Sequence, residues 1–184
     1  ELGVGSAIVY SMYKPIALGD DDLVCALLNL YRKIYRIIGV GIVIIGLIIV
    51  PFIRNLVSGE IPSDVNIYIL FILYILNTSV SYFLFAYKKS LIHACQRDDI
   101  TSKICICTDV FLNILQVIFL IATRNYYWFI IWQIVSVLVS NIINSYYADK
   151  LFPQYQSRGQ ISKEQGADIK KRVTGLMVIK IAAV

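Results

Sequence analysis

Residues 65–87 read VNIYILFILYILNTSVSYFLFAY, and none of these 23 side chains is charged. A helix needs about 20 mostly apolar residues to cross the hydrocarbon core of a bilayer. The strands of a membrane barrel would instead alternate in polarity over about 10 residues, which this stretch does not do. It therefore predicts a membrane-spanning helix over 65–87.

Three more runs of this kind occur in the chain, and they predict spans over 34–53, 104–123 and 125–148. Shorter apolar stretches at 2–18 and 173–184 predict two partial spans. Charged residues make up only 16% of the chain, where a soluble domain has roughly a quarter. The expected fold is an all-α transmembrane helical bundle with four full spans and two partial ones.

Basic residues alternate between the connections of these spans, which predicts the orientation of the chain. Of the Lys and Arg residues outside the last partial span, 14 lie in every second connection and two, Arg54 and Arg124, lie in the others. Basic connections remain on the cytoplasmic side of a membrane. We expect a multi-pass membrane protein whose basic connections lie in the cytoplasm, and whose net charge of +5 is attracted to anionic lipid headgroups rather than to nucleic acid.

The predicted organisation has three parts. Residues 1–150 form transmembrane helices, 151–172 form a cytoplasmic connection, and 173–184 begin another helix. Ser162 and Gln165 within that connection match a capping box, which marks a helix start. The acidic run Asp20 to Asp22 is interpreted as a solvated loop. Because Glu1 replaces an initiator Met and both ends are apolar, we expect the chain to be an internal piece of a longer protein.

Polar residues recur at helical spacing inside the spans and predict four polar stripes. The stripes consist of Gly3, Ser6, Tyr10 and Lys14; of Tyr74, Asn77, Ser81 and Lys88; of Cys105, Asp109, Asn113, Gln116 and Thr123; and of Gln133, Ser136, Ser140 and Asn144. Such side chains either join neighbouring helices or line a polar pathway, and the sequence leaves both interpretations open. The candidate pathway residues are Asp109, Asn113, Gln116, Asn77, Ser81, Gln133, Ser140 and Asn144.

Asp109 is the single charge within the predicted span 104–123, about six residues from the start of its helix. An ionised Asp at the centre of a membrane helix costs roughly 2.5–3.5 kcal/mol on insertion scales. It either reaches back to cytoplasmic water or Lys103, or it is buried and carries a proton or binds a cation.

In the first full span Arg32, Arg36, Gly39 and Gly46 share one face. The two glycines allow another helix or a lipid tail to come close, and Arg is suited to bidentate phosphate recognition. The candidate residues for a diphosphate or lipid headgroup are Arg32, Arg36, Lys14 and Lys88. The alternative is that YRKIYR at 31–36 is an ordinary interfacial anchor.

No catalytic or metal-binding constellation is evident. His93 lacks Ser and Asp partners for catalysis, and the pairs His93 with Cys95 and Cys105 with Cys107 do not have the spacing of structural zinc ligands. All four cysteines fall near the reducing cytoplasmic face, so free thiols are expected. We expect no enzyme activity, no resident metal and no cofactor.

Several motifs, in order along the chain, resemble bacterial polysaccharide flippases, the O-antigen and capsule repeat-unit transporters related to multidrug-and-toxin-extrusion (MATE) proteins. These motifs are GVGSAIVYSMYKPIA at 3–17, YRKIYR at 31–36, SYFLFAYKKSLI at 81–92, NYY at 125–127, Gln133, SYYADKLFP at 145–153 and KRVTGL at 171–176. The resemblance implies a fragment of the amino-terminal half of a MATE-like transporter, from the second helix to the start of the seventh.

The resemblance further implies a multi-pass protein of the bacterial cytoplasmic membrane, in which an undecaprenyl-diphosphate-linked oligosaccharide crosses to the outer leaflet by alternating access, driven by H⁺ or Na⁺. The expected partners are this lipid-linked substrate, membrane lipids and the rest of the same chain. Three alternatives remain: a drug or metabolite exporter of the same fold, a membrane enzyme of polysaccharide assembly, and a scaffold that transports nothing.

Overall fold

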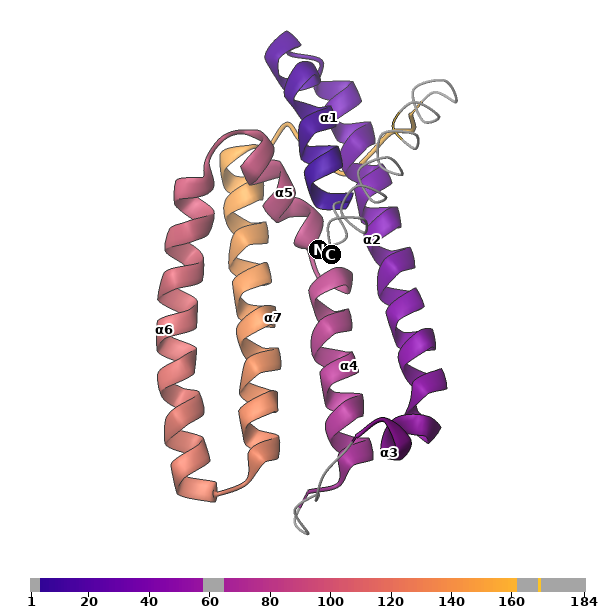
Figure 1. Cartoon of the computed structure of the whole chain (residues 1–184). Coiled ribbons are helices and arrows are strands. Elements are labelled where there is room, and N and C mark those ends of the chain that lie inside the picture. The colour runs from indigo at the N-terminus through magenta and orange to yellow at the C-terminus, as the bar shows by residue number, and fades with distance from the viewer. Residues whose placement is uncertain (1–3, 58–64, 162–168, 170–184) are drawn as a thin grey trace. The chain divides into compact units, whose positions relative to one another are not determined.

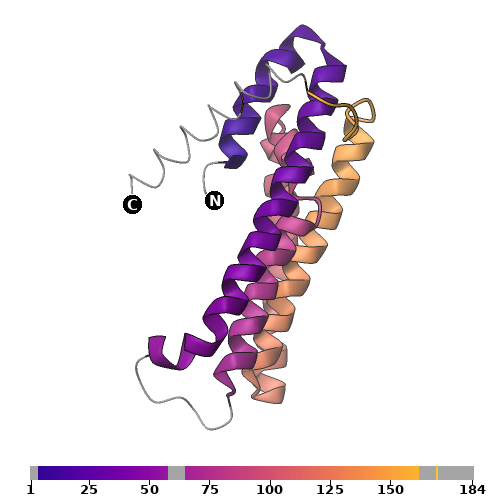
Figure 2. The same cartoon turned by 90° about the vertical axis from the view of Figure 1, so that its right-hand side faces the viewer.

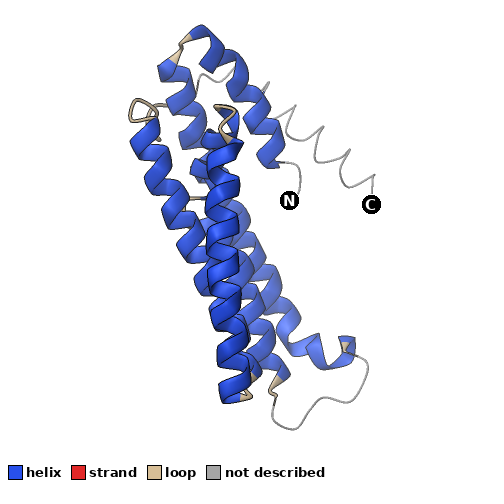
Figure 3. Ribbon diagram, turned by 90° about the vertical axis from the view of Figure 1, so that its left-hand side faces the viewer, coloured by secondary structure: helices blue, strands red, loops and turns tan. Residues whose placement is uncertain are grey.

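The structure is a computed structural model that describes residues 4–57, 65–161 and 169. All its regular elements in these residues are helices, as Figure 3 shows by colour, so the all-helical prediction is confirmed over the described part. The elements are α1 (Val4–Leu18), α2 (Asp21–Ile49), η1 (Val50–Phe52), α3 (Ile53–Leu56), α4 (Ile67–Phe83), α5 (Ala86–Ala94), α6 (Asp98–Thr123) and α7 (Tyr126–Leu151) (Figure 1).

Three of the described helical segments are long and apolar enough to cross a membrane, namely Asp21–Leu56, α6 and α7. A fourth span exists only if α4 and α5 are counted together, although they are bent by 48° at the break between them. The predicted partial span at 2–18 corresponds to the helix α1. The one predicted at 173–184 lies outside the described residues, as do Ser162 and Gln165.

The prediction of one continuous helix over 65–87 is wrong, because α4 ends at Phe83 and α5 begins at Ala86. Phe85 adopts the left-handed region, with φ 56°. Just before the break, Thr78 Oγ1 donates to the Tyr74 carbonyl at 3.0 Å and Ser81 Oγ donates to the Thr78 carbonyl at 2.7 Å. Hydroxyl groups that bond back to their own helix in this way favour bending.

Two helices begin earlier than the apolar runs predict. α2 starts at Asp21 rather than residue 34, and Asp20 caps it by accepting a hydrogen bond from the Leu23 amide at 3.0 Å. α6 starts at Asp98 rather than residue 104. In both helices two Asp residues occupy the first turn, where the helix dipole favours negative charge. The interpretation of Asp20 to Asp22 as a solvated loop is therefore wrong for Asp21 and Asp22, which are helical, although all three side chains are exposed.

The chain forms two compact units. Unit 1 comprises residues 1–34, 85–102 and 144–184, and unit 2 comprises 35–84 and 103–143.

In unit 1, α1 packs against α5, and the segment that follows α7 is held on the start of α2. Tyr31 is fully buried and donates its hydroxyl to the Gly5 carbonyl at 3.0 Å. Asn29 Nδ2 donates to the Gly159 carbonyl at 2.8 Å, and Cys25 Sγ to the Gln154 carbonyl at 3.4 Å. The bonds from Asn29 and Cys25 hold the non-helical residues 152–161 against α2. These residues are the described part of the predicted connection.

In unit 2, the helices lie side by side in the order α2, α4, α7, α6 (Figures 1 and 2). At the α2–α4 contact, a Cβ added to Gly46 would lie 2.6 Å from Ile75 Cδ1, so the glycine permits the close approach. α4 and α7 run parallel, since Tyr127 of α7 contacts Asn66, the residue that caps α4. Thus α7 lies between α4 and α6, although α6 precedes it in the sequence.

Candidate functional site

Polar residues follow one stripe along each of three helices in unit 2. The stripes are Tyr74, Thr78 and Ser81 on α4; Tyr126, Gln133 and Ser140 on α7; and Cys105, Asp109 and Asn113 on α6. The spacings of four and seven residues place the members of each stripe on one side of a helix with 3.6 residues per turn.

Direct contacts join these stripes across neighbouring helices. The hydroxyls of Tyr74 and Tyr126 are 3.0 Å apart, and Cys105 Sγ lies 3.9 Å from Ser140 Oγ. Ser136 Oγ donates to Asp109 Oδ1 at 3.4 Å. Since a contact joins each stripe to the next, we call the three stripes together the polar face of unit 2.

The opposite side of the same three helices is apolar. Residues two positions away from the polar stripe lie about 200° around the helix. At these positions stand exposed hydrophobic side chains: Leu76 on α4, Ile131 and Ile142 on α7, and Phe111 on α6. Unit 2 therefore has one face suited to lipid and one that contains a carboxylate, amides and hydroxyls.

The candidate pathway residues divide by their exposure. Asp109, Asn113 and Gln133 are exposed on the polar face, whereas Ser140 and Ser81 are half-buried there. The buried Gln116 donates through Nε2 to the Phe129 carbonyl at 2.8 Å, which makes it a link between α6 and α7.

Two further candidates do not belong to the exposed part of this face. Asn77 is half-buried, and its Oδ1 has no hydrogen-bond partner among the described residues. Asn144 is fully buried in unit 1 rather than in unit 2.

The four candidate residues for phosphate recognition do not form a single cluster. Lys14 and Arg36 are exposed, in unit 1 and unit 2 respectively. Arg32 Nη1 donates to Ser157 Oγ at 3.5 Å. Lys88 forms an ion pair with Asp149, and the break at Phe85 separates it from the α4 stripe to which the sequence assigned it.

Arg32 and Lys88 are nevertheless associated with one cavity of unit 1, of about 310 Å³. Lys88 lines this cavity itself, and Arg32 bonds to Ser157, which also lines it. The remaining lining residues are Leu28, Tyr87, Leu91, Asp149, Tyr155 and Gln156. Burial, followed by the negative charge of Asp21, raises the pKa of the Tyr155 hydroxyl, so this group remains a neutral hydrogen-bond donor.

This cavity was not predicted from the sequence. Tyr155, Gln156 and Ser157 lie in a segment without helical or strand periodicity, and they reach Leu28 only through tertiary folding. The one available signal was the opposite charge of Lys88 and Asp149, which lie 61 residues apart.

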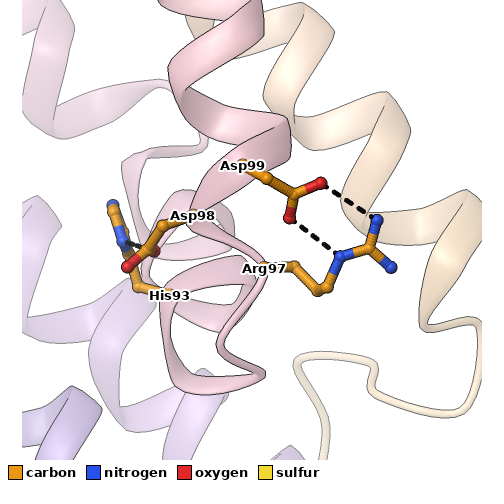
Figure 4. Close-up of polar contacts among 4 residues, drawn as sticks. All are labelled: His93, Arg97, Asp98 and Asp99. Carbon is orange, nitrogen blue, oxygen red and sulfur yellow. Dashed lines mark hydrogen bonds and ion pairs between the residues drawn. The ribbon is translucent and has the colours of Figure 1, made fainter.

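The turn between α5 and α6 carries two surface ion pairs (Figure 4). His93 pairs with Asp98, and Arg97 binds Asp99 through Nε at 2.9 Å and Nη2 at 3.2 Å. The bond to Asp99 raises the pKa of Arg97. His93 thus has a carboxylate partner here, although the sequence showed none. The ion pair of His93 and Asp98 closes the turn. None of the four residues drawn in Figure 4 provides a nucleophile beside it.

All four cysteines are free. Over the described residues, no group of three His, Cys, Asp or Glu side chains is placed to hold a metal ion.

No protein-family model, curated protein or solved structure matches the chain.

Proposed function

We propose that the protein carries undecaprenyl-diphosphate-linked oligosaccharide repeat units across the bacterial cytoplasmic membrane by alternating access. The observation that carries this proposal is the polar face of unit 2, built from three otherwise apolar helices. The motifs shared with polysaccharide flippases supply the class of cargo.

Lipid is a poor environment for the polar face. Asp109 and Asn113 are exposed on a helix whose other exposed side chains at this level, such as Val110 and Phe111, are hydrophobic. An ionised Asp exposed to hydrocarbon costs roughly 2.5–3.5 kcal/mol, which favours a position beside water or other polar groups. Amides and hydroxyls are also the groups that exchange hydrogen bonds with sugar hydroxyls, so the face suits an oligosaccharide.

The diphosphate of the proposed cargo is negatively charged, so we expect cationic side chains to bind it near the cytoplasmic surface. Arg32 and Arg36 occupy successive turns of α2, in the part of the chain where basic residues concentrate. Guanidinium groups bind phosphate in bidentate geometry. In this proposal they attract the diphosphate, and Asp109, which accepts a hydrogen bond from Ser136, exchanges the coupling H⁺ or Na⁺.

Cysteine accessibility tests whether the polar face adjoins water. In a background without native cysteines, Asn113→Cys and Gln133→Cys should react with a water-soluble thiol reagent in the intact membrane. The matched controls Phe111→Cys and Ile131→Cys lie two residues away on the apolar side and should remain unlabelled. If all four positions were equally protected from the reagent, the polar side chains would serve only to join neighbouring helices.

Transport itself is tested with the variant Arg32→Ala, Arg36→Ala in the bacterium that makes the polysaccharide. We expect surface polysaccharide to fall several-fold while the amount of protein in the membrane is unchanged. Lys33→Ala is the matched control, since it removes a neighbouring exposed cation from the same helix. Normal surface polysaccharide in the double variant would argue against the proposed role and favour export of another compound.

A further inference from the structure

The cavity of unit 1 contains a cation and an anion that already neutralise each other. The ammonium of Lys88 pairs with the carboxylate of Asp149, and both residues line the cavity. The Lys88 side chain is 17% exposed and that of Asp149 57%, so the ammonium lies in the wall and the carboxylate nearer to water. Hydrophobic surface from Leu28 and Leu91 completes the lining.

This arrangement discriminates between classes of ligand. A simple anion that bound Lys88 would displace Asp149 and leave this carboxylate, whose side chain is 57% exposed, with only water as its partner. A simple cation at Asp149 would leave the Lys88 ammonium, which is only 17% exposed, without a partner, and this is the more unfavourable of the two. A ligand with one phosphate and one ammonium replaces the single ion pair by two, and no charge is left over.

A hydrogen-bond donor for the phosphate is also present. Because Ser157 Oγ accepts from Arg32 Nη1, its own hydrogen is free to point at a ligand oxygen. Tyr155 lines the same cavity, but its hydroxyl is already hydrogen-bonded to Asp21.

The volume of the cavity and its position relative to the end of α7 restrict the class of ligand further. Pockets for drug-sized ligands span about 300–1,000 Å³, so a cavity of about 310 Å³ suits a group of headgroup size. Gln156 and Ser157 follow the end of α7 at Leu151, where a helix that crosses the bilayer meets the headgroup region.

We propose that this cavity binds a phosphoethanolamine group, either as the headgroup of a phospholipid or as the free compound. Its phosphate contacts Lys88 and the Ser157 hydroxyl, and its primary ammonium contacts Asp149. This binding is independent of the proposed function, because it requires no transport and involves a different lipid.

Lipid retention by the intact protein provides the test. The protein is reconstituted in nanodiscs with equal parts phosphatidylethanolamine, phosphatidylcholine and phosphatidylglycerol, extracted in mild detergent, and analysed by native mass spectrometry. We expect phosphatidylethanolamine to be retained about tenfold over the other two, a difference of about 1.4 kcal/mol. Phosphatidylcholine is the matched zwitterion, since its quaternary ammonium has no hydrogen to donate to Asp149.

Two kinds of variant link retention to the cavity. Gln156→Trp fills it from an exposed loop position and should abolish the enrichment, whereas Gln160→Trp, on the same loop but outside the lining, should not. Asp149→Asn leaves Lys88 as an unpaired cation and should shift the preference to anionic phosphatidylglycerol. The proposal is overturned if Gln156→Trp retains the enrichment or if Asp149→Asn leaves the preference unchanged.

Calorimetric titration with O-phosphoethanolamine separates the two sources. Binding of the free compound that displaces the retained lipid assigns the cavity to the shared group. Retention of the lipid without measurable binding of the free compound assigns it to the membrane headgroup. Absence of both contradicts the proposal, and a transport defect in any variant has no bearing on it.

Discussion

At the scale of single residues, neighbours on one stripe of α6 have different environments. Gln116 is buried and bonded to the Phe129 carbonyl, whereas Asn113, one turn earlier, is exposed. Spacing alone places them on the same side of the helix. Their distance from the α7 backbone, which no sequence pattern states, determines which one joins helices and which one is available to a ligand.

This difference predicts that replacement by Leu has different effects at the two positions, one on stability and the other on transport. Gln116→Leu should lower the free energy of unfolding by about 0.6–1.5 kcal/mol, because a buried interhelical hydrogen bond is lost. Asn113→Leu should leave stability nearly unchanged but reduce transport. Unfolding in a titration with sodium dodecyl sulfate and surface polysaccharide in cells measure the two effects. Equal stability losses would mean that both side chains are structural.

Cys95 provides a residue-scale prediction about pH. Burial raises the pKa of its thiol to about 11, so little thiolate exists near pH 8 in the folded protein. In a variant with Cys95 as the only cysteine, alkylation at pH 8 should be about a hundredfold slower in the folded protein than after unfolding, because the thiolate fraction falls by about that factor. The folded rate should keep rising above pH 10, where the unfolded rate has levelled off. A folded rate that levels off near pH 9 would contradict this prediction.

At the scale of elements, helix contacts in unit 2 depend on where glycine permits approach. Gly46 faces Ile75 of α4, while Gly41 on the same helix has open space at its Cβ position. Gly46→Leu should therefore destabilise the protein by about 1–3 kcal/mol through overpacking. Gly41→Leu should have little effect. Unfolding in sodium dodecyl sulfate measures both, and a comparable loss in the two variants would contradict the tight α2–α4 contact.

The elements also show what the sequence was able to predict. Uncharged runs locate the apolar parts of α2, α6 and α7, because hydrocarbon requires unbroken apolar helix. They do not locate helix ends, since caps such as Asp20 extend a helix into water, where apolar character is no longer required. The break at Phe85 was missed because backbone conformation leaves no hydrophobicity signal.

The site was predicted less completely than the fold. The stripes of α4, α6 and α7 were recognised from their spacing, but the contacts that join them depend on helix order. That order, with α7 beside α4, follows from contacts such as Tyr74 with Tyr126. The cavity of unit 1 arises from residues distant in sequence and was not predicted.

At the scale of the whole molecule, the placement of charge predicts how the chain is oriented. Arg54 and Arg124 are the basic residues of the connections assigned to the outer side. The other described basic residues precede α2's apolar run, lie in α5 and up to the start of α6, or lie at and after the end of α7. Asn125→Cys should react with a membrane-impermeant maleimide in intact cells. Gln160→Cys should react only after the membrane is permeabilised. The reverse result would invert the proposed orientation.

The position of α7 between α4 and α6 has a consequence for biogenesis. α4 is synthesised before α6 and α7, so Asn66 and Tyr74 lack their partners Tyr127 and Tyr126 until α7 has been made. The later pair of helices meets α4 through its second member, α7. A nascent chain that ends after α6 therefore lacks the neighbour that lies between α4 and α6 in the folded unit.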